Sequence, residues 1–424
     1  MTTRTLARRF AMLRALRWLP LGITLPFLVL LPQDRGLSLA EVGVIFAMHS
    51  IVAILLEVPS GGLADAIGRR ITLVIGGVLT AAGLAVFAVA TGVPAFMLAL
   101  GVIAAGRALI SGSLEAWFVD EARAIDPELA LHRPLATAAT VEGVTMAAAA
   151  TAGGLLPALL GGGLDESGGA TLVKFSVPSL AGVAGALVFV AAVLRYVEEP
   201  THVRTGGWRA AGATTIAGLK AARASRTVRL LLLSALAVGT IMSTTELLWQ
   251  PRLADLLGGG SAGNAPLFGA LAAASMLAAA LGSALSPRLS RAAGRARAFP
   301  GAYVALGLSL ALLAVVDTVA LFCVVYLAYF WAVGVVDPIH YETLHDAIEG
   351  RNRATIASAE GLAMQTGGIG GNLVLTPLAG AAGLALAWGV CAGLALCAAA
   401  LAAGTRASAP ARPRPRPAAP SGAA

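Results

Sequence analysis

Twelve long runs of apolar residues limit the fold of this chain more than any other feature of its sequence. Each run has roughly the twenty residues that an α-helix needs to cross the hydrocarbon core of a bilayer. The runs lie at residues 13–32, 41–64, 71–91, 94–116, 135–160, 171–194, 229–250, 264–286, 298–316, 318–338, 354–377 and 380–403. Of the 424 residues, 58% are hydrophobic and only 12% are charged, and the mean hydropathy is +0.82. The sequence therefore predicts an all-α integral membrane protein with twelve transmembrane helices, and it excludes an ordinary soluble enzyme.

The basic residues predict how these helices are oriented. If the N-terminus is cytoplasmic, only Arg35, Lys174 and Arg252 fall on the outer side, and Arg107 lies within a run. All other lysines and arginines then lie on the cytoplasmic side, as the positive-inside rule requires. We expect a multi-pass protein of the cytoplasmic (inner) membrane with both termini in the cytoplasm. The net charge of +8 is then a consequence of topology, so no nucleic-acid partner is expected.

The longest polar interruption divides the chain into two halves, because six apolar runs precede it and six follow it. We expect four regions: an N-terminal six-helix bundle at 1–194, a cytoplasmic linker at 195–228, a C-terminal six-helix bundle at 229–404, and a tail at 405–424. The tail is rich in proline, arginine and alanine and cannot build a core, so it is expected to be disordered.

The loop between the second and third runs carries a distinctive motif. It reads Gly61-Gly62-Leu63-Ala64-Asp65-Ala66-Ile67-Gly68-Arg69-Arg70. This motif resembles the loop signature of the major facilitator superfamily (MFS), with alanine at 66 where that family usually has arginine. The matching positions, which the resemblance assigns to gating, are Gly61, Leu63, Asp65, Gly68, Arg69 and Arg70. The resemblance also implies that Asp65 interacts with the N-terminal end of the eleventh helix, where the helix dipole favours a carboxylate.

The matching loop of the second half carries a degenerate copy of this motif, from Gly282 through Arg288 and Arg291 to Gly294 and Arg295. Such duplication is typical of transporters built from repeats. The segments 56–61 and 111–116 resemble those of uncharacterised bacterial MFS permeases and putative exporters. The resemblance implies the MFS fold, with twelve helices in two six-helix bundles. The glycine-proline pattern that antiporters of the family carry in the fifth helix is missing from residues 149–157.

Ionisable residues within the runs are candidate functional groups, because an intramembrane charge costs about 2.5–3.5 kcal/mol on insertion scales. Arg107 and Glu142 lie at similar depths in the fourth and fifth helices, given the helical rise per residue. We therefore predict that they form a pair, either as a static ion pair or as part of a proton relay. Glu57, one turn before Gly61, is assigned to the same group and is expected to brace the cytoplasmic gate.

Further polar and aromatic residues within the runs predict a substrate cavity. They are His49 on the second helix; Glu246, Trp249 and Gln250 on the seventh; Tyr326, Tyr329 and Trp331 on the tenth; and Glu360, Gln365 and Asn372 on the eleventh. The groups on the second, seventh and tenth helices each have a structural alternative: a packed histidine for His49, an interfacial anchor for the group on the seventh helix, and ordinary core packing for the aromatic residues.

The function implied by the resemblance is secondary active transport of a small organic solute by alternating access, with proton-coupled efflux as the leading form. No phosphate-binding Gly-x-x-x-x-Gly-Lys-Ser/Thr motif is present, so ATP is not expected to drive it. The few buried charges favour an amphipathic or hydrophobic solute over a sugar. We expect a monomer whose partners are the solute, protons and the bilayer, with no cofactor, no metal ion and no enzymatic activity. The alternatives are a proton-coupled importer of a small metabolite and a transport-inactive membrane sensor.

Overall fold

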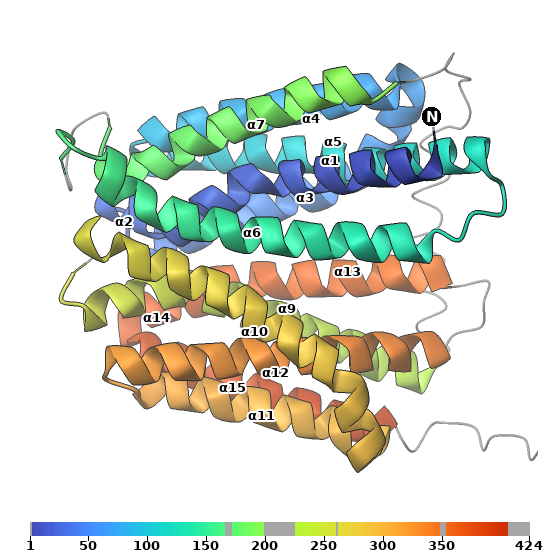
Figure 1. Ribbon diagram of the computed structural model, residues 1–424. Coiled ribbons are helices and arrows are strands. Elements are labelled where there is room, and N and C mark those ends of the chain that lie inside the picture. The colour runs from blue at the N-terminus through green and yellow to red at the C-terminus, as the bar shows by residue number, and fades with distance from the viewer. Residues whose placement is uncertain (1, 166–171, 199–224, 260–261, 348–352, 406–424) are drawn as a thin grey trace, which may run out of the picture.

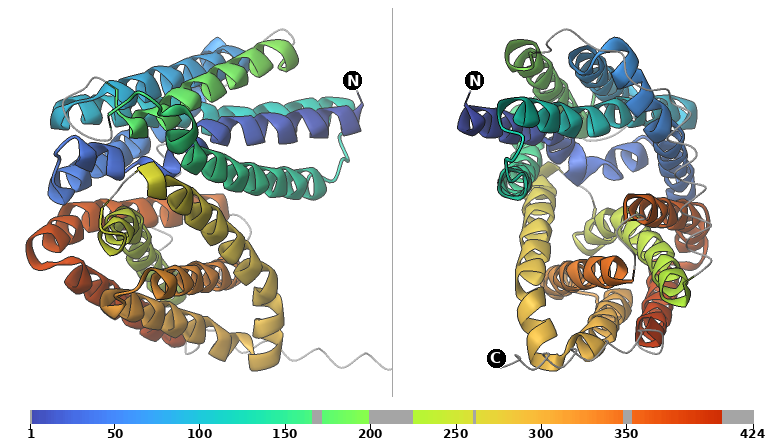
Figure 2. Two further views of the ribbon diagram at one scale, coloured as in Figure 1. Left: turned by 60° about the vertical axis from the view of Figure 1, so that its left-hand side comes forward. Right: turned by 90° about the vertical axis from the view of Figure 1, so that its right-hand side faces the viewer.

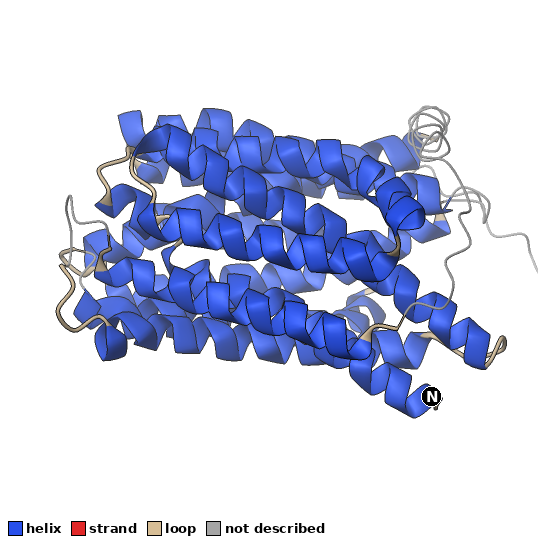
Figure 3. Cartoon of the chain, turned by 90° about the horizontal axis from the view of Figure 1, so that it is seen from above, coloured by secondary structure: helices blue, strands red, loops and turns tan. Residues whose placement is uncertain are grey.

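The computed structural model describes residues 2–165, 172–198, 225–259, 262–347 and 353–405, with the backbone alone for residues 57–59, 61, 62, 65, 353–355 and 357. In these ranges the chain is helical, with short loops and no strand (Figure 3). The predicted linker and tail lie largely outside the described residues.

The helices of the first half are α1 (Thr3–Thr24), η1 (Leu25–Phe27), α2 (Leu30–Asp34), α3 (Leu39–Ile67), α4 (Arg69–Val89), α5 (Gly92–Ile125), α6 (His132–Leu160), η2 (Lys174–Ser176) and α7 (Val177–Tyr196). Those of the second half are α9 (Arg226–Leu256), η3 (Ala262–Asn264), α10 (Ala265–Ala293), α11 (Arg295–Val315), α12 (Val319–Asp346), α13 (Arg353–Gly370), the π-helical η5 (Gly371–Leu375), α14 (Thr376–Ala382) and α15 (Leu384–Gly404). In Figure 1 the blue-to-green half lies above the yellow-to-red half, and Figure 2 shows the same division from two further sides.

Twelve of the described helices correspond to the twelve predicted runs. Ten are long and apolar enough to span a membrane by length and composition alone. The other two are α1, which carries five arginines, and α13, which continues through η5 and α14 as one interrupted helix. The predicted fold class, twelve helices in two bundles, is confirmed.

The two halves repeat one turn, which the duplicated motif predicted. Gly68 joins α3 to α4 with a φ of +99°, and Gly294 joins α10 to α11 with a φ of +76°. Such backbone conformations favour glycine because it lacks a Cβ. The arginine after each glycine pairs with an aspartate of the second helix that follows: Arg69 with Asp120 at 2.5 Å, and Arg295 with Asp346 at 2.5 Å, 51 residues along the chain in each case. Each bridge joins two helices of one bundle.

Close contacts between the bundles gather at the end of the molecule opposite the N-terminus of α1. There α6 crosses α10 so closely that a Cβ on Gly154 would lie 2.6 Å from the Cα of Gly269. A second crossing brings α3 against η5 and α14, where a Cβ on Gly43 would lie 2.3 Å from the carbonyl oxygen of Asn372. Small residues permit such backbone approach between membrane helices. The two bundles are therefore packed together at this end.

Candidate functional site

A cavity of about 380 Å³ lies near mid-depth, and both bundles contribute to its wall. Helices α1, α3, α4 and α5 form most of the wall, and α13 supplies Gln365 from the second bundle. The lining residues are Arg17, Trp18, Leu21, His49, Ser50, Ala53, Thr80, Ala104, Arg107, Ala108, Ile110, Ser111 and Gln365. Its volume falls in the range of about 300–1,000 Å³ that is usual for small-molecule sites. Of the residues predicted for the substrate cavity, His49 and Gln365 lie on this wall.

Arg107 is the most unusual group of the cavity. It lies midway along α5, yet its side chain is exposed to the cavity. The centre of its guanidinium lies 4.8 Å from the centroid of the Trp18 ring, within the range of a cation–π interaction. Its Nη1 lies 3.5 Å from Nε2 of His49, whose Nδ1 lies 3.0 Å from the carbonyl oxygen of Leu100. An Nδ1 proton donated to that carbonyl leaves the Nε2 lone pair facing Arg107.

The predicted pairing of Arg107 with Glu142 is wrong. The Glu142 carboxylate accepts a hydrogen bond from Nε of Arg14 and lies 3.9 Å from Nη2 of Arg17. Arg17 also pairs with Glu115 on α5 at 3.3 Å. Helix α1 packs against both α5 and α6, so its arginines take the position that the prediction gave to Arg107. These α1 residues were missed as site residues because their arginines were assigned to membrane topology.

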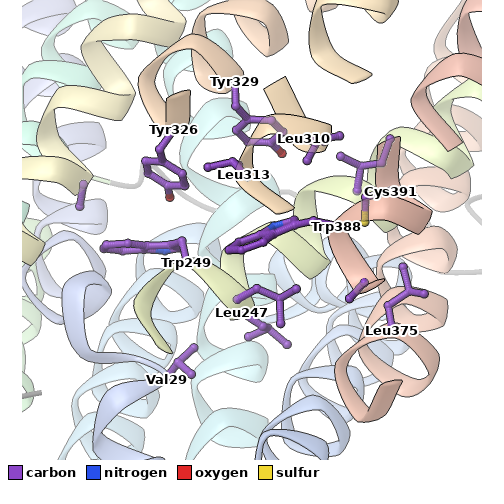
Figure 4. Packing of buried hydrophobic residues seen from close by; sticks show 14 of the residues in the cluster. Val29, Leu247, Trp249, Leu310, Leu313, Tyr326, Tyr329, Leu375, Trp388 and Cys391 are labelled. Carbon is purple, nitrogen blue, oxygen red and sulfur yellow. The ribbon is translucent and has the colours of Figure 1, made fainter. Parts of the chain in front are cut away.

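The aromatic residues predicted for the cavity wall belong to the core of the second bundle in this conformation. Trp249, Tyr326 and Tyr329 are each 1% exposed. The Trp249 and Tyr326 ring centroids lie 5.4 Å apart, and those of Tyr326 and Tyr329 lie 6.3 Å apart. Figure 4 shows these rings among Leu247, Leu313 and Trp388. Trp331, on the same helix, is half-buried against that core. Ordinary core packing, the alternative interpretation, thus describes the buried rings.

Gln250 joins the two bundles at their packed end. Its Oε1 accepts hydrogen bonds from the backbone N–H groups of Val29 and Leu30, at 3.0 and 3.3 Å, and its Nε2 donates one to the carbonyl of Leu25 at 3.0 Å. The side chain is fully buried. It satisfies backbone groups where the chain passes from η1 into α2, so it is a structural contact between the halves in this conformation.

Replacing Gln250 with leucine should loosen this end. A buried donor or acceptor left without a partner costs about 1–3 kcal/mol, so we expect a loss of about 2 kcal/mol for the closed arrangement. This corresponds to a roughly thirtyfold change in the equilibrium between closed and open forms. Hydrogen–deuterium exchange should show faster exchange at the amides of Val29 and Leu30. The matched change Gln33→Leu, on the nearby α2, should leave the exchange rates of these two amides unaltered. Equal exchange rates in the two variants would refute the prediction.

Two of the three remaining predicted cavity residues of the second bundle form polar contacts with other side chains. Glu360 lies 3.0 Å from Nε2 of His340 on α12. Asn372 is buried in η5, and its Oδ1 accepts a hydrogen bond from Ser243 on α9 at 2.8 Å. Glu246, on α9, has one carboxylate oxygen that is buried and receives no hydrogen bond from any described residue. Of these residues, Glu246 alone presents a polar atom that the described chain leaves unsatisfied.

The loop motif lies at the end of the bundles opposite the packed contacts. Besides the pairing of Arg69 with Asp120, Nη2 of Arg70 donates a hydrogen bond to the carbonyl of Leu194 on α7 at 2.6 Å. Leu63 is 40% exposed. Only the backbone of Glu57, Gly61 and Asp65 is described, so their predicted gating contacts remain predictions.

Comparison with known proteins agrees with this architecture. The chain is similar over nearly its whole length to the nucleoside transporter NupG (TM-score 0.76, 15% identity, 95% of this chain and 98% of that one). It is equally similar to a bacterial homologue of the human lysosomal transporter Spinster in an inward-facing, unoccupied conformation (TM-score 0.75, 15% identity, 96% and 97%). A mutant of the peptide transporter POT in complex with sulfate follows (TM-score 0.71, 13% identity, 96% and 98%). At such identities the likeness concerns the fold.

The sequence itself gives the family. No curated protein matches the chain. The model of the Major Facilitator Superfamily, however, matches residues 10–263, more than half of the chain. The duplicated glycine-arginine turn, the two bundles of six helices and the cavity between them accord with that match. The chain therefore belongs to the major facilitator superfamily and is a multi-pass membrane protein.

Proposed function

We propose that this protein is a secondary active transporter that carries a small organic solute across the cytoplasmic membrane by alternating access. The observation that supports this most is the combination of one cavity near mid-depth with two bundles whose close contacts gather at one end. Movement of the bundles against each other would separate the contacts at Gly154 and Gln250 and expose the cavity from that side.

The distribution of basic residues supports an orientation. Under the positive-inside rule the packed end faces outward and both termini face the cytoplasm. The conformation described above is then inward-facing, which is the state in which an exporter collects its solute. We propose export as the direction of transport. Import of a small metabolite is the alternative, and the sidedness of uptake distinguishes the two.

Glu246 supports coupling to protons. One oxygen of this carboxylate is buried and receives no hydrogen bond from a described residue, which makes the charged form costly, and adding a proton removes that charge. Opening of the packed end would bring water to this part of α9 and permit the carboxylate to exchange a proton with the outer side. The proposed cycle thus pairs a protonated, closed form with a hydrated, open one, and a pH gradient can drive the cycle in one direction. We assign this role to Glu246 in place of the relay predicted for Arg107 and Glu142.

Transport in proteoliposomes with an imposed pH gradient tests the proposal. We expect accumulation of at least one solute from a panel of organic acids, lipophilic cations, amino acids and sugars. Glu246→Gln keeps the shape of the side chain but cannot release a proton, so we expect it to abolish accumulation driven by the gradient while solute exchange across the membrane continues. Glu128→Gln, in an exposed loop, is the matched control.

Two outcomes would contradict the proposal. Folded protein that moves no member of the panel under any gradient would favour the transport-inactive sensor. Accumulation by Glu246→Gln equal to that of the unaltered protein would remove proton coupling through this residue and leave transport itself in place.

A further inference from the structure

The cavity wall carries one cation that the described part of the chain does not neutralise. Arg107 projects into the cavity, and no carboxylate of a described residue lies within ion-pair distance of it. Its contacts are the face of Trp18 and the lone pair of His49, both uncharged groups. Neither contact removes the charge, so the guanidinium remains free to bind an anion.

The neighbouring arginines differ from Arg107 in this respect. Arg14 and Arg17 share the carboxylate of Glu142, and Arg17 also pairs with Glu115. Two carboxylates thus balance two guanidiniums beside the cavity. The described residues of the wall include two arginines and no acidic residue. The described part of the wall therefore has an excess of positive charge, and that excess lies on Arg107.

The surroundings of Arg107 favour an anion with an apolar body. A guanidinium presents planar N–H groups that match a carboxylate in a two-bond arrangement. His49 contacts one edge of the Arg107 guanidinium, and the Trp18 ring packs against the face of the guanidinium. Alongside lie apolar side chains and a few polar ones; the apolar ones are Leu21, Ala53, Ala104, Ala108 and Ile110, and the polar ones are Ser50, Thr80, Ser111 and Gln365. An uncompensated charge at mid-membrane is costly, and a bound anion offsets this cost.

We propose that the cavity binds an organic anion, a carboxylate attached to an apolar group, and that Arg107 holds the carboxylate. His49 is a positioning residue: its Nδ1 bond to Leu100 fixes the ring, and its Nε2 orients the guanidinium. The proposal names the solute class and rests on the transport function proposed above. It also excludes lipophilic cations, because the cavity arginines repel them.

Three ligands with one phenethyl frame test this selectivity: 3-phenylpropionate, phenethylamine and 2-phenylethanol. They differ in charge while keeping the same apolar body. Isothermal titration with the purified full-length protein in detergent should give saturable binding of 3-phenylpropionate at millimolar concentration, weaker binding of the alcohol and none of the amine. Arg107→Gln should weaken carboxylate binding roughly ten- to hundredfold, the value of a hydrogen bond to a charged group. Arg107→Lys should retain part of the affinity.

A control variant separates local from general charge effects. Arg133→Gln removes an exposed arginine on α6, outside the cavity, and should leave binding unchanged. Circular dichroism and thermal melting establish that each variant is folded. Equal or tighter binding of the amine, undiminished carboxylate binding by folded Arg107→Gln, or no carboxylate binding by the folded, unaltered protein would each overturn the proposal.

The two proposals fail in different ways. If 3-phenylpropionate binds through Arg107 but neither it nor any other solute of the panel is carried across the membrane of proteoliposomes, the anion site stands and the transport function falls. If another solute of the panel is transported while the carboxylate does not bind, the transport function stands and the anion site falls.

Discussion

Replacing Gly154 with valine is expected to prevent the two bundles from closing at their packed end. A Cβ at this position would lie 2.6 Å from the Cα and 2.8 Å from the N of Gly269. Both atoms belong to the backbone of α10, so no side chain can turn aside to make room. Overpacking costs about 1–3 kcal/mol, which shifts the equilibrium between the closed and open forms by roughly five- to 150-fold. Transport should fall by at least about fivefold.

Accessibility of the cavity measures this shift. We would place a cysteine at Ser50 on the cavity wall, in a variant whose Cys323, Cys391 and Cys397 are replaced by alanine. A membrane-impermeant thiol reagent should label Cys-substituted Ser50 faster from the outer side in Gly154→Val than in the unaltered background.

The control lies on the same helix. A Cβ at Gly143 would have no atom within 4 Å, so Gly143→Val introduces the same β-branched side chain without the crossing. It should leave both labelling and transport close to the unaltered values. Equal effects of the two substitutions would mean that the valine acts through the helix itself, and the assignment of Gly154 to the closure would be wrong.

Replacing Glu142 with glutamine is expected to cause the largest loss of stability. The Glu142 side chain is 17% exposed, and its carboxylate forms ion pairs with the guanidiniums of both Arg14 and Arg17. Removing one partner of a buried ion pair leaves an uncompensated charge, so we expect a loss of about 3 kcal/mol in the free energy of unfolding. Thermal melting in detergent should show a clearly lower midpoint than for the unaltered protein.

A double-mutant cycle identifies the cause. If the loss arises from the ion pair, then Arg14→Gln combined with Glu142→Gln should cost less than the two single changes added together. Glu128→Gln, on the exposed loop before α6, should leave the midpoint unchanged. A folded Glu142→Gln protein with an unaltered midpoint but no pH-driven transport would instead restore the relay interpretation of this residue.

The sequence predicts the helices well because each depends on local composition. Twenty apolar residues must form a helix in hydrocarbon, since backbone polar groups have no other partner there. The duplicated turn was also visible in advance, because Gly68 and Gly294 are required by a local backbone conformation. The repeated salt bridges of Arg69 and Arg295 follow from the same duplication, although the sequence analysis did not identify their partners.

The partners of intramembrane charges could not be obtained in the same way. The helical rise gives the depth of Arg107 and Glu142, but a contact also depends on how each helix is rotated and on which helix lies between them. Here α1 supplies Arg14 and Arg17, and these two residues pair with the Glu142 carboxylate in place of Arg107. For the same reason the aromatic residues of α12 could not be distinguished as core or cavity wall, because depth does not tell which side of a helix faces the cavity.

The contact between Gly154 and Gly269 also bears on how the transporter responds to its surroundings. The approach is made by backbone atoms, and Gln250, which reinforces it, forms hydrogen bonds to backbone groups. None of these groups titrates, and none relies on attraction between ions that dissolved salt could screen. Osmotic upshift or acidification of the external medium should therefore leave these two contacts themselves intact.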